Sequence, residues 1–477
     1  MLLSKLIDKK FIKNDFDVKE IKRDARKVEK GDAFFCFATD KMQAFLRCQQ
    51  AQKYGAGVCF SHFDIPNCVK VEDVRELFAC ACANYYHRAC DKMKIVGISG
   101  TNGKTTTAHI IAEMLKRNNH KVGLIGTNGV FFDRKSFNYD MTTPDADILH
   151  KIFFEMWQCG VEYVVMEVSA HAIMQKRIAG IHFEVGVLTN ITQDHLDYFE
   201  TMEKYENAKF AFFTKEHIKK AVVCIDDERA KKVLSLTAVP VITYGLQNPC
   251  DCFAVDVFCE ISDSSFVANV CDSVLRIKTN LVGKHNVYNS LAALAVCQRL
   301  GLGDEEMERG LNFIRPVEGR FNVFNVDGKY VVIDYAHTPD GIEKVIATAK
   351  ELTDKKVELV FGCGGDRDKT KRAKMGKASE LADFVCLTND NPRTENPEEI
   401  ISQIEEGMTR PHMVETDRKQ AIEKMIDFAS VGDIVIIAGK GAEKYQEIGD
   451  RKIPYSDFDV LADYCKNKTE EKIKYGG

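Results

Sequence analysis

Apolar and polar residues alternate with two different periods along the segment from Lys94 to His120. The apolar run at Ile95, Val96 and Ile98 has the character of a buried strand, and the apolar positions 110, 111, 114 and 115 then recur at helical spacing. A glycine-rich turn separates the two patterns. The segment therefore predicts a strand, a tight loop and a helix in that order.

The same rhythm of short apolar runs and helical patterns continues for most of the chain. Alternation of this kind predicts the α/β class, with mainly parallel sheets covered by helices on both faces. Predicted strands lie at 94–99, 122–125, 163–168, 185–190, 221–225, 330–334, 357–361, 384–388 and 434–438, with helices through residue 352 and near 369–382. Two further strands, one entered by a turn at 31–32 and one at 57–60, are predicted nearer the N-terminus.

At 477 residues the chain is too long for one hydrophobic core. The change in pattern along it predicts three domains, at residues 1–90, 91–316 and 317–477. Hydrophobic residues make up 45% and charged residues 29%, which is typical of a globular protein.

Charge and cysteine usage exclude several classes of function. The net charge of -5 argues against non-specific nucleic-acid binding, so no nucleic-acid partner is expected. The first residues lack the apolar core of a signal peptide, and no run approaches the roughly 18 apolar residues of a membrane span. The 17 cysteines form no C-x-x-C pair, which disfavours zinc and fits a reducing cytoplasm.

The turn after the first strand of the second domain has the composition of a nucleotide-binding loop. Gly97, Gly100 and Gly103 allow close bending, Lys104 can reach the outer phosphates of a nucleotide, and the Thr105 hydroxyl suits magnesium. The phosphates would lie at the N-terminus of the following helix, which favours anions. The strict pattern G-x-x-x-x-G-K-[ST] fails at one position, because residue 98 is isoleucine.

Polar residues follow the next predicted strands, where parallel sheets bind ligands. Glu167 ends an apolar run, so an unpaired carboxylate there would be costly unless a cation lies near it. Together with His195 and Thr105 it is a candidate for a divalent-cation site, whereas for His171 a ligand role and a structural role stay equally open. The hydroxyls of residues 142 and 143 are sufficiently explained as helix caps, and Lys209 is predicted locally to be a solvated surface lysine.

In the third domain the polar strand ends lie at 334–340, 362–369, 390–393 and 439–443. Gly362, Gly364 and Gly365 do not form G-x-G-x-x-G, which argues against a dinucleotide site. Arg367 and Arg393 follow neighbouring strands. Their planar forks suit carboxylates or phosphates, although solvated surface arginines explain them equally well from the residues alone.

Seven motifs in this order resemble those of the Mur ligase family: GTNGKTTT (100–107), MEVSAHA (166–172), TNITQDHLDYF (189–199), DYAHTPDG (334–341), GCGGDRDKTKR (362–372), DNPR (390–393) and AGKGAEKYQ (438–446). These enzymes build the peptide of cell-wall precursors by ATP-driven amide formation. The resemblance implies an N-terminal UDP-binding domain, a central P-loop ATPase and a C-terminal Rossmann-like domain that binds an amino acid. It also implies a cytoplasmic enzyme, which we expect to be a monomer.

The resemblance assigns roles that spacing could not. ATP would contact Gly100, Thr101, Asn102, Gly103, Lys104, Thr105, Thr106, Arg320, Asp334 and His337. Magnesium would associate with Thr105, Glu167, His195 and Lys209, the last as an N6-carboxylated lysine, which replaces the surface role predicted locally. Lys104, Lys209 and His195 would be catalytic. UDP-N-acetylmuramoyl-L-Ala-D-Glu would be held by Thr142, Thr143, Ser169, Gln175 and Arg177.

The motif DNPR resembles the version associated with meso-diaminopimelate rather than L-lysine. Diaminopimelate carries an extra carboxylate at its distal end, which the fork of Arg393 would favour. Matching to the family completes the amino-acid pocket with Arg367, Asp390, Asn391, Pro392, Gly439 and Glu443, and Glu443 would receive the distal ammonium. The implied reaction adds meso-diaminopimelate to the UDP-linked dipeptide through an acyl phosphate.

Four departures from the family pattern concern other positions. Ala25, Ala170 and Ala442 stand where the family usually has Ser, Ser and His, and the usual DG-H segment is missing around residues 39–45. The first and the last of these features bear on how uridine is held. A ligase similar to folylpolyglutamate synthetase is the rival enzyme, disfavoured by the N-terminal domain, and a non-catalytic scaffold is disfavoured by the presence of Lys104, Glu167 and Lys209.

Overall fold

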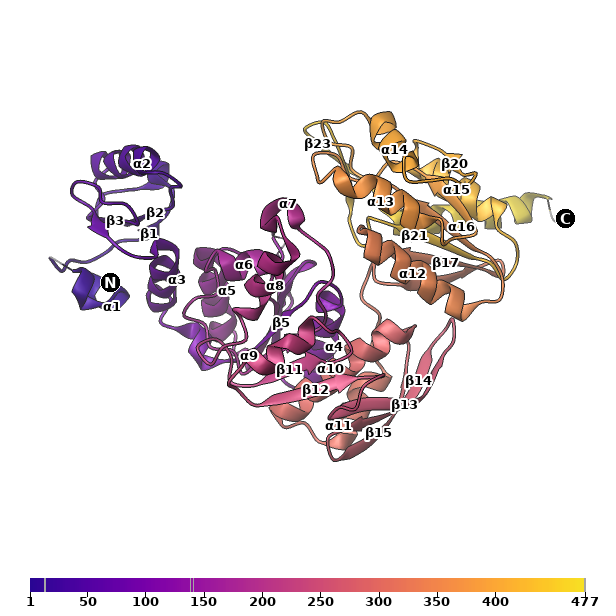
Figure 1. Ribbon diagram of the computed structural model, residues 1–477, viewed down its shortest axis with the longest axis horizontal. Helices are drawn as coiled ribbons and strands as arrows, with labels where there is room; N and C mark the ends of the chain where they lie inside the picture. The colour runs from indigo at the N-terminus through magenta and orange to yellow at the C-terminus, as the bar shows by residue number, and fades with distance from the viewer. Residues whose placement is uncertain (13, 138, 140, 476–477) are drawn as a thin grey trace. The chain divides into compact units, whose positions relative to one another are not determined.

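The computed structural model describes residues 1–12, 14–137, 139 and 141–475 and has the predicted α/β class (Figure 1). Contacts between Cα atoms divide the chain into two compact units. The first comprises Met1–Gly100, Ile111–Asn190 and Thr201–Thr243, and the second comprises Thr101–Ile110, Ile191–Glu200 and Tyr244–Gly477. This division does not test the boundaries predicted at 90 and 316, which remain a prediction.

The N-terminal sheet is parallel throughout, with strand order β1-β2-β3-β4. Its elements are β1 (Ile21–Lys22), β2 (Ala33–Cys36), β3 (Val58–Ser61), β4 (Val69–Lys70), α1 (Leu3–Leu6), α2 (Lys41–Lys53) and α3 (Val74–Tyr85), with 3-10 turns η1 (Lys9–Phe11), η2 (Ala25–Lys27) and η3 (Ala89–Lys92). Alternate residues of β2 face two cores, Phe35 packing with α3 and Phe34 with α2. Both strands predicted in this region are confirmed.

The largest sheet has eleven strands in the order β15-β14-β13-β12-β11-β10-β5-β9-β6-β7-β8. Its strands are β5 (Lys94–Ser99), β6 (Val122–Gly126), β7 (Gly129–Phe132), β8 (Lys135–Phe137), β9 (Tyr163–Glu167), β10 (Val185–Leu188), β11 (Ala221–Cys224), β12 (Val241–Gly245), β13 (Cys252–Cys259), β14 (Ser264–Val270) and β15 (Ser273–Thr279). The division between the two units runs through β12. The five predicted strands are confirmed as the buried, parallel part of the sheet, and the antiparallel strands toward its edges were not predicted.

Helices in the same part of the chain are α4 (Lys104–Arg117), α5 (Ala146–Gln158), α6 (Ala170–Met174), α7 (Leu196–Phe199), α8 (Met202–Phe210), α9 (Val233–Leu236), α10 (Lys284–Leu300) and α11 (Asp304–Asn312), with the 3-10 turn η4 (Ala230–Lys232). Helix α4 carries its apolar positions as predicted, since Ile110, Ile111, Met114 and Leu115 are all fully buried. The predicted strand, loop and helix are therefore confirmed.

The C-terminal sheet has the order β16-β17-β21-β18-β19-β20, and only β16 runs antiparallel to its neighbour. Its elements are β16 (Asn322–Val326), β17 (Lys329–Asp334), β18 (Val357–Phe361), β19 (Phe384–Leu387), β20 (Met413–Val414), β21 (Ile434–Ala438), α12 (Pro339–Leu352), α13 (Thr370–Ser379), α14 (Pro397–Glu405), α15 (Arg418–Phe428) and α16 (Asp457–Tyr475). A separate hairpin, β22 (Tyr445–Ile448) and β23 (Arg451–Pro454), follows β21.

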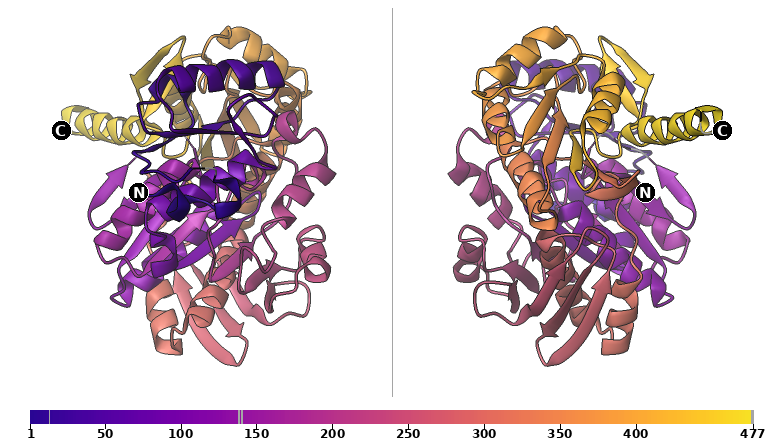
Figure 2. Two further views of the ribbon diagram at one scale, coloured as in Figure 1. Left: turned by 90° about the vertical axis from the view of Figure 1, so that its left-hand side faces the viewer. Right: turned by 90° about the vertical axis from the view of Figure 1, so that its right-hand side faces the viewer.

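Helices cover both faces of the C-terminal sheet because its strands are apolar on both sides. Along β21, Ile434 and Ile436 pack with α12, α13 and α14, whereas Val435 and Ile437 pack with α15 and α16. The last turns of α16 extend past the sheet in both views of Figure 2. This is the doubly wound arrangement predicted for the third domain, with the carboxyl ends of its parallel strands at one edge.

Glu358 is a buried carboxylate on β18, between β21 and β19. Its side chain is 1% exposed, and its Oε2 has no hydrogen-bond partner among the described residues. Burial raises the pKa of Glu358 from 4.5 to about 7, and the neighbouring Asp433 adds to the rise. A carboxyl with this pKa keeps its proton in the folded protein at a pH where the unfolded chain has released it.

Stability is therefore expected to fall as the pH rises from about 4.5 to about 7, because the folded state binds more protons than the unfolded state in this window. The shift corresponds to about 3 kcal/mol of unfolding free energy. In the variant Glu358→Gln this loss disappears, so its unfolding temperature should exceed that of the wild type at about pH 8 and approach it at about pH 5. Thermal unfolding of both proteins measures the difference, and an offset that stays constant with pH would contradict the assignment.

Candidate active site

The loop between β5 and α4 is shaped by two glycines with positive φ. Gly100 has φ +143°, and a Cβ there would lie 1.9 Å from the Thr189 hydroxyl oxygen. Gly103 has φ +83°, and a Cβ there would lie 2.5 Å from Oδ1 of Asn289. No other residue type fits these backbone positions without displacing its neighbours. The loop leads into the N-terminus of α4, where backbone N–H groups and the helix dipole favour an anion.

Gly97 has a different role from the one predicted. It lies inside strand β5, paired with Gly186 and Met166, and does not take part in the turn. A Cβ at this position would lie 2.7 Å from ring atoms of Phe183 and Phe212. The glycine is needed for packing of these two rings and not for bending the phosphate loop.

Hydrogen bonds within the second unit hold the loop residues in place. Lys104 Nζ donates to the Thr101 carbonyl at 2.7 Å, and the Thr101 hydroxyl donates to the Thr192 carbonyl at 3.1 Å. Asn102 Nδ2 donates to Asp340 Oδ2 at 2.7 Å, and the Thr192 hydroxyl donates to the same oxygen at 3.2 Å. Thr192 and Asp340 were not predicted as site residues, although both lie in motifs that resemble the family.

Arg320 Nη2 donates to the Thr105 hydroxyl oxygen at 3.3 Å, and its guanidinium lies 4.7 Å from the ring centroid of Tyr335. Asp334, which ends β17, accepts backbone N–H bonds from Phe321 at 2.8 Å and Ala336 at 2.7 Å. Burial raises the pKa of Asp334, and Arg320 opposes that rise. Arg320, Asp334 and Thr105 are thus brought together within the second unit, as the family resemblance implies for residues near ATP.

Two histidines and an aspartate stand near Lys104. Burial lowers the pKa of His337 to about 4, so its ring is neutral at pH 7, and Nδ1 then donates to the Tyr335 carbonyl at 2.9 Å. Burial tends to raise the pKa of Asp194, but neighbouring positive charge, that of His195 first, outweighs the effect of burial, and the net pKa is lowered. His195 adopts φ +53° and lies 3.3 Å from Asp194 between Nε2 and Oδ2. Asp194 is therefore an anionic member of this group, and it was not among the predicted binding residues.

Glu167 and Lys209 lie in the first unit. Glu167 is 1% exposed and accepts hydrogen bonds from Thr127, at 2.9 Å from the backbone N–H to Oε1 and at 3.2 Å from the hydroxyl to Oε2. Lys209 is also 1% exposed, and its Nζ donates to the Gly100 carbonyl at 2.7 Å. The local prediction of a solvated surface lysine is wrong, because α8 turns this residue inward against the phosphate loop.

The five residues predicted to hold the UDP-linked substrate form one connected group in the first unit. The Thr142 hydroxyl lies 3.1 Å from that of Thr127. The Thr143 hydroxyl donates to the Glu167 carbonyl at 2.9 Å and accepts from the Ser169 N–H at 3.1 Å. Arg177 donates to the Thr143 carbonyl and to Gln175 Oε1, both at 2.8 Å.

The hydroxyls of residues 142 and 143 do not cap a helix, contrary to the prediction. Helix α5 begins after Asp145, and no side chain caps it. Asp145 instead pairs with Arg177 at 3.0 Å and with Arg23 at 2.7 Å. Ser169 is the residue that caps, accepting the N–H of Ala172 at the start of α6. Neither Arg23 nor Asp145 was predicted as a site residue, because the two partners of this ion pair lie far apart in the sequence.

The donor atoms proposed for magnesium are oxygens and an imidazole, which such a cation accepts. Within the part of the chain that the structure describes, no three His, Cys, Asp or Glu side chains are grouped as a metal site. Because magnesium keeps several waters and binds nucleotide phosphates, it needs only one or two carboxylates from the protein. The buried Glu167 carboxylate fits that requirement, and it was predicted as a metal ligand.

Loops after β18, β19 and β21 bring together the predicted amino-acid residues. Asn391 Nδ2 donates to Glu443 Oε2 at 3.0 Å. A Cβ on Gly439 would lie 3.2 Å from Oδ2 of Asp390, and Asp390, Asn391 and Pro392 are buried. A Cβ on Gly364 would lie 3.1 Å from Arg393 Nη1 and 3.8 Å from Cγ of Arg367, so the two predicted arginines flank the same glycine.

Arg393 is held from both sides. Its Nη1 donates to the Gly365 carbonyl at 2.7 Å, and its Nε lies 2.6 Å from Glu447 Oε2 on the hairpin strand β22. Its backbone has φ +51° and forms hydrogen bonds with Glu447 and Gly449. The guanidinium is thus oriented before any ligand binds, and Glu447 is a residue that sequence reasoning missed.

Two further residues fix the loops to each other. Arg372, whose side chain is fully buried, donates to both carboxylate oxygens of Glu395 at 2.9 Å. Glu395 also accepts the backbone N–H of Asp366 at 2.6 Å. These contacts join the loop after β18 to the loop after β19, and the side chains of both Arg372 and Glu395 were absent from the prediction.

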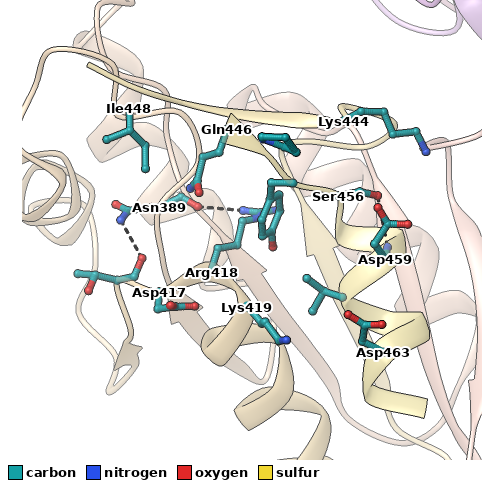
Figure 3. A pocket seen from close by; sticks show the side chains of 14 residues that line it. Asn389, Asp417, Arg418, Lys419, Lys444, Gln446, Ile448, Ser456, Asp459 and Asp463 are labelled. Atoms are coloured by element: carbon teal, nitrogen blue, oxygen red, sulfur yellow. Dashed lines mark hydrogen bonds between the residues drawn. The ribbon is translucent and has the colours of Figure 1, made fainter. Parts of the chain in front are cut away.

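Arg418 connects the segments at the ends of strands β19 and β21. Its guanidinium pairs with Asp457 at 2.8 Å and donates to the carbonyls of Asn389 and Ala438, at 3.3 Å and 3.0 Å. Arg418, Asn389 and Gln446 are among the residues that line a pocket of about 590 Å³. Figure 3 shows these three side chains together. Gln446 Nε2 donates to the Asp390 carbonyl at 2.7 Å. The described residues that line this pocket include none of the predicted amino-acid residues.

Comparison with known proteins supports the family resemblance. Residues 98–297 match the model of the Mur ligase middle domain, and residues 319–441 match the model of the Mur ligase, glutamate ligase domain. No helix among the described residues is both long and apolar enough to cross a membrane.

Among curated relatives, the UDP-N-acetylmuramoyl-L-alanyl-D-glutamate--2,6-diaminopimelate ligase 1 of Clostridium acetobutylicum is 40% identical, with 94% of this chain and 95% of the relative covered. The ligase of the corresponding name from Clostridium botulinum is 36% identical, with 98% and 99% covered. A solved structure of a UDP-N-acetylmuramoyl-L-alanyl-D-glutamate--2,6-diaminopimelate ligase superposes with a TM-score of 0.71 at 30% identity, covering 95% of each chain.

Proposed function

The chain belongs to the Mur ligase family, and we propose that it is the ATP-dependent ligase that adds meso-diaminopimelate to UDP-N-acetylmuramoyl-L-Ala-D-Glu. The product extends the peptide of a peptidoglycan precursor. A reaction that consumes ATP and a nucleotide-linked substrate fits a cytoplasmic enzyme, and we propose that it acts as a monomer. The division of labour follows the predicted domains at residues 1–90, 91–316 and 317–477.

One observation supports meso-diaminopimelate as the amino acid that is added. At the carboxyl ends of β18, β19 and β21, the guanidinium of Arg393 and the carboxylate of Glu443 stand on adjoining loops, linked through Asn391 and Glu447. The distal end of diaminopimelate carries one carboxylate and one ammonium, which these two groups complement. L-Lysine offers only the ammonium and would leave Arg393 without its ligand.

The proposed reaction has two steps. The D-glutamate side-chain carboxylate attacks the γ-phosphorus of ATP, which gives an acyl phosphate and releases ADP. The neutral diaminopimelate amine then attacks the acyl carbon and the C–N bond forms. Inorganic phosphate leaves with the C–O bond electrons, and the nitrogen releases one proton as it becomes an amide. Phosphoryl transfer depends mainly on positioning and charge neutralisation.

The residues of the second unit supply part of that positioning. Lys104 is the cation that would contact the outer phosphates, and the backbone of residues 100–106 would enclose them. Arg320 beside Thr105 adds a second cation, and Asp334 and His337 are proposed to lie near the ribose and phosphates. The neutral ring of His337 leaves Nε2 as a hydrogen-bond acceptor.

Magnesium, when bound, would neutralise charge on the phosphates, and Thr105, Glu167, His195 and Lys209 are proposed to hold it. Lys209 in its ordinary form is a cation and would repel the metal. We propose that its amine carries a carboxyl group, which turns the side chain into an anion. Burial of Lys209 against the loop carbonyl of Gly100 supports this, because a side chain so placed reaches the phosphate loop and not the solvent.

The direct test is a complete assay. Purified protein with ATP, magnesium, UDP-N-acetylmuramoyl-L-Ala-D-Glu and meso-diaminopimelate should release one phosphate per tripeptide formed, measured by a coupled phosphate assay and by mass spectrometry of the product. Omission of the UDP-linked dipeptide should abolish phosphate release. Turnover with a folate substrate in its place would favour the rival ligase.

A further inference from the structure

Lys440 is a fully buried lysine two residues after the end of strand β21, and none of the roles above uses it. Its side chain is 0% exposed, and its Nζ lies 2.9 Å from Asn391 Oδ1, 2.9 Å from Glu443 Oε2 and 3.4 Å from Asp390 Oδ1. A buried ammonium is costly unless each of its N–H groups meets an acceptor. Here three acceptors surround it, and all three belong to residues of the proposed amino-acid pocket.

The first consequence is a fixed orientation of the Asn391 amide. Its Oδ1 accepts from Lys440 Nζ and from the Glu447 backbone N–H at 3.0 Å. An oxygen that accepts two such bonds determines which end of the amide is the NH₂ group. Nδ2 is thereby directed to Glu443 Oε2, 3.0 Å away.

The second consequence is that the two carboxylate oxygens of Glu443 differ in their hydrogen-bond partners. Oε2 accepts from both Lys440 and Asn391. Among the described residues, no donor contacts Oε1, and the side chain is 24% exposed. Oε1 is therefore the oxygen that can receive an ammonium group from a ligand.

The third consequence concerns charge. The proposed amino-acid site contains the carboxylates of Asp390 and Glu443, and Lys440 compensates one of them. It also contains Arg393, which is paired with Glu447, and Arg367, which adds one positive charge. The group as a whole is close to neutral, which suits a zwitterionic ligand end. Without Lys440 it gains one negative charge and favours a ligand that ends in a lone cation.

We propose that Lys440 is a positioning and specificity-determining residue that holds Asn391 and Glu443 in place for the distal ammonium of the incoming amino acid and favours a zwitterionic end over a lone cation. This inference rests on the proposed function. Lys440 does not touch the ligand in this account and acts through Glu443 and Asn391.

The test compares Lys440→Gln with a matched control, Lys444→Gln. Lys444 lies four residues after Lys440, and its exposed side chain pairs with Glu318. In Lys440→Gln the KM for diaminopimelate should rise about 30-fold or more, since one partner of a buried charge pair is lost. The KM values for ATP and for the UDP-linked dipeptide should stay within about twofold, and the preference for diaminopimelate over L-lysine should fall. The control should match the wild type in all of these.

A double-mutant cycle with Glu443→Gln separates positioning from general destabilisation. If Lys440 acts through Glu443, the double variant should lose little more than Glu443→Gln alone. Losses that multiply, or KM values that rise together for all three substrates, would overturn the proposal. If Lys440→Gln does not fold, the variant Lys440→Arg tests the proposal instead, because arginine keeps the positive charge but changes the length of the side chain. An unchanged KM for diaminopimelate in Lys440→Arg would then refute the proposal.

The proposed function and the inference about Lys440 are contradicted by different results. A wild-type protein that releases no phosphate with diaminopimelate defeats the proposed function. A wild-type protein that turns over normally while Lys440→Gln keeps its KM for the amino acid and its selectivity defeats this inference alone.

Discussion

Lys209→Met is expected to lower the rate of ligation by about a thousandfold or more while leaving the protein folded. Methionine has nearly the length of lysine and suits a site that is 1% exposed. Methionine lacks the side-chain nitrogen. In the wild type, Lys209 Nζ lies 2.7 Å from the Gly100 carbonyl oxygen and 4.6 Å from the ring centroid of Tyr205. If that nitrogen carries a carboxyl group in the active enzyme, the variant loses an anion beside the phosphate loop.

The exposed Lys204 on the same helix gives a matched control, since Lys204→Met should keep wild-type activity. Two measurements belong together: steady-state phosphate release and intact mass under mild conditions in bicarbonate buffer. The wild type should carry the additional mass of one CO₂ and Lys209→Met should not. A Lys209→Met enzyme with wild-type turnover would show that neither the amine nor its carboxylated form is needed.

Arg393→Ala is expected to raise the KM for diaminopimelate by about 100-fold, because a charge-assisted, two-pronged contact with the distal carboxylate disappears. The fork is pre-oriented by the Gly365 carbonyl and by Glu447, so the wild type needs little rearrangement to bind. Kinetics with each substrate varied in turn check this, and the KM for ATP should not change.

Two variants sharpen the test. Arg393→Lys keeps the charge but not the planar fork, and should recover only part of the lost affinity. Arg451→Ala removes an exposed arginine from the neighbouring strand β23 and should behave as the wild type. An effect of Arg393→Ala confined to the KM for ATP would contradict the assignment of this arginine to the amino acid.

The buried parallel strands could be predicted from the sequence because their apolar runs are uninterrupted. β5, β18 and β21 have the predicted bounds. Strands β13 and β15 were missed although the sequence indicates them. The segment CFAVDVFC (252–259) is apolar except at Asp256, and in β15 the apolar Leu275 and Ile277 alternate with Arg276 and Lys278.

Single residues show where local reasoning about the site fails. Lys209 is polar, on a short helix, and locally indistinguishable from a surface lysine, yet tertiary packing buries it. Gly97 fits the glycine spacing of a phosphate loop, but it makes room for two phenylalanine rings. In both cases the deciding neighbours come from distant parts of the chain.

The supporting residues were missed for the same reason. Asn102 meets Asp340 across 238 positions, and Lys440 meets Asn391 across 49. Such partners depend on which strands are neighbours in the sheet and on how the loops at their ends bend. The motifs could be found in sequence order, whereas the network that orients them required the fold.

We propose that Arg393 and Glu443 together select an amino acid with a zwitterionic distal end. Phosphate release with ATP, magnesium and UDP-N-acetylmuramoyl-L-Ala-D-Glu, compared between meso-diaminopimelate and L-lysine, measures this selection. We expect a kcat/KM for meso-diaminopimelate at least about 100-fold above that for L-lysine, because with L-lysine the guanidinium of Arg393 has no carboxylate to bind. Equal values for the two amino acids would contradict it.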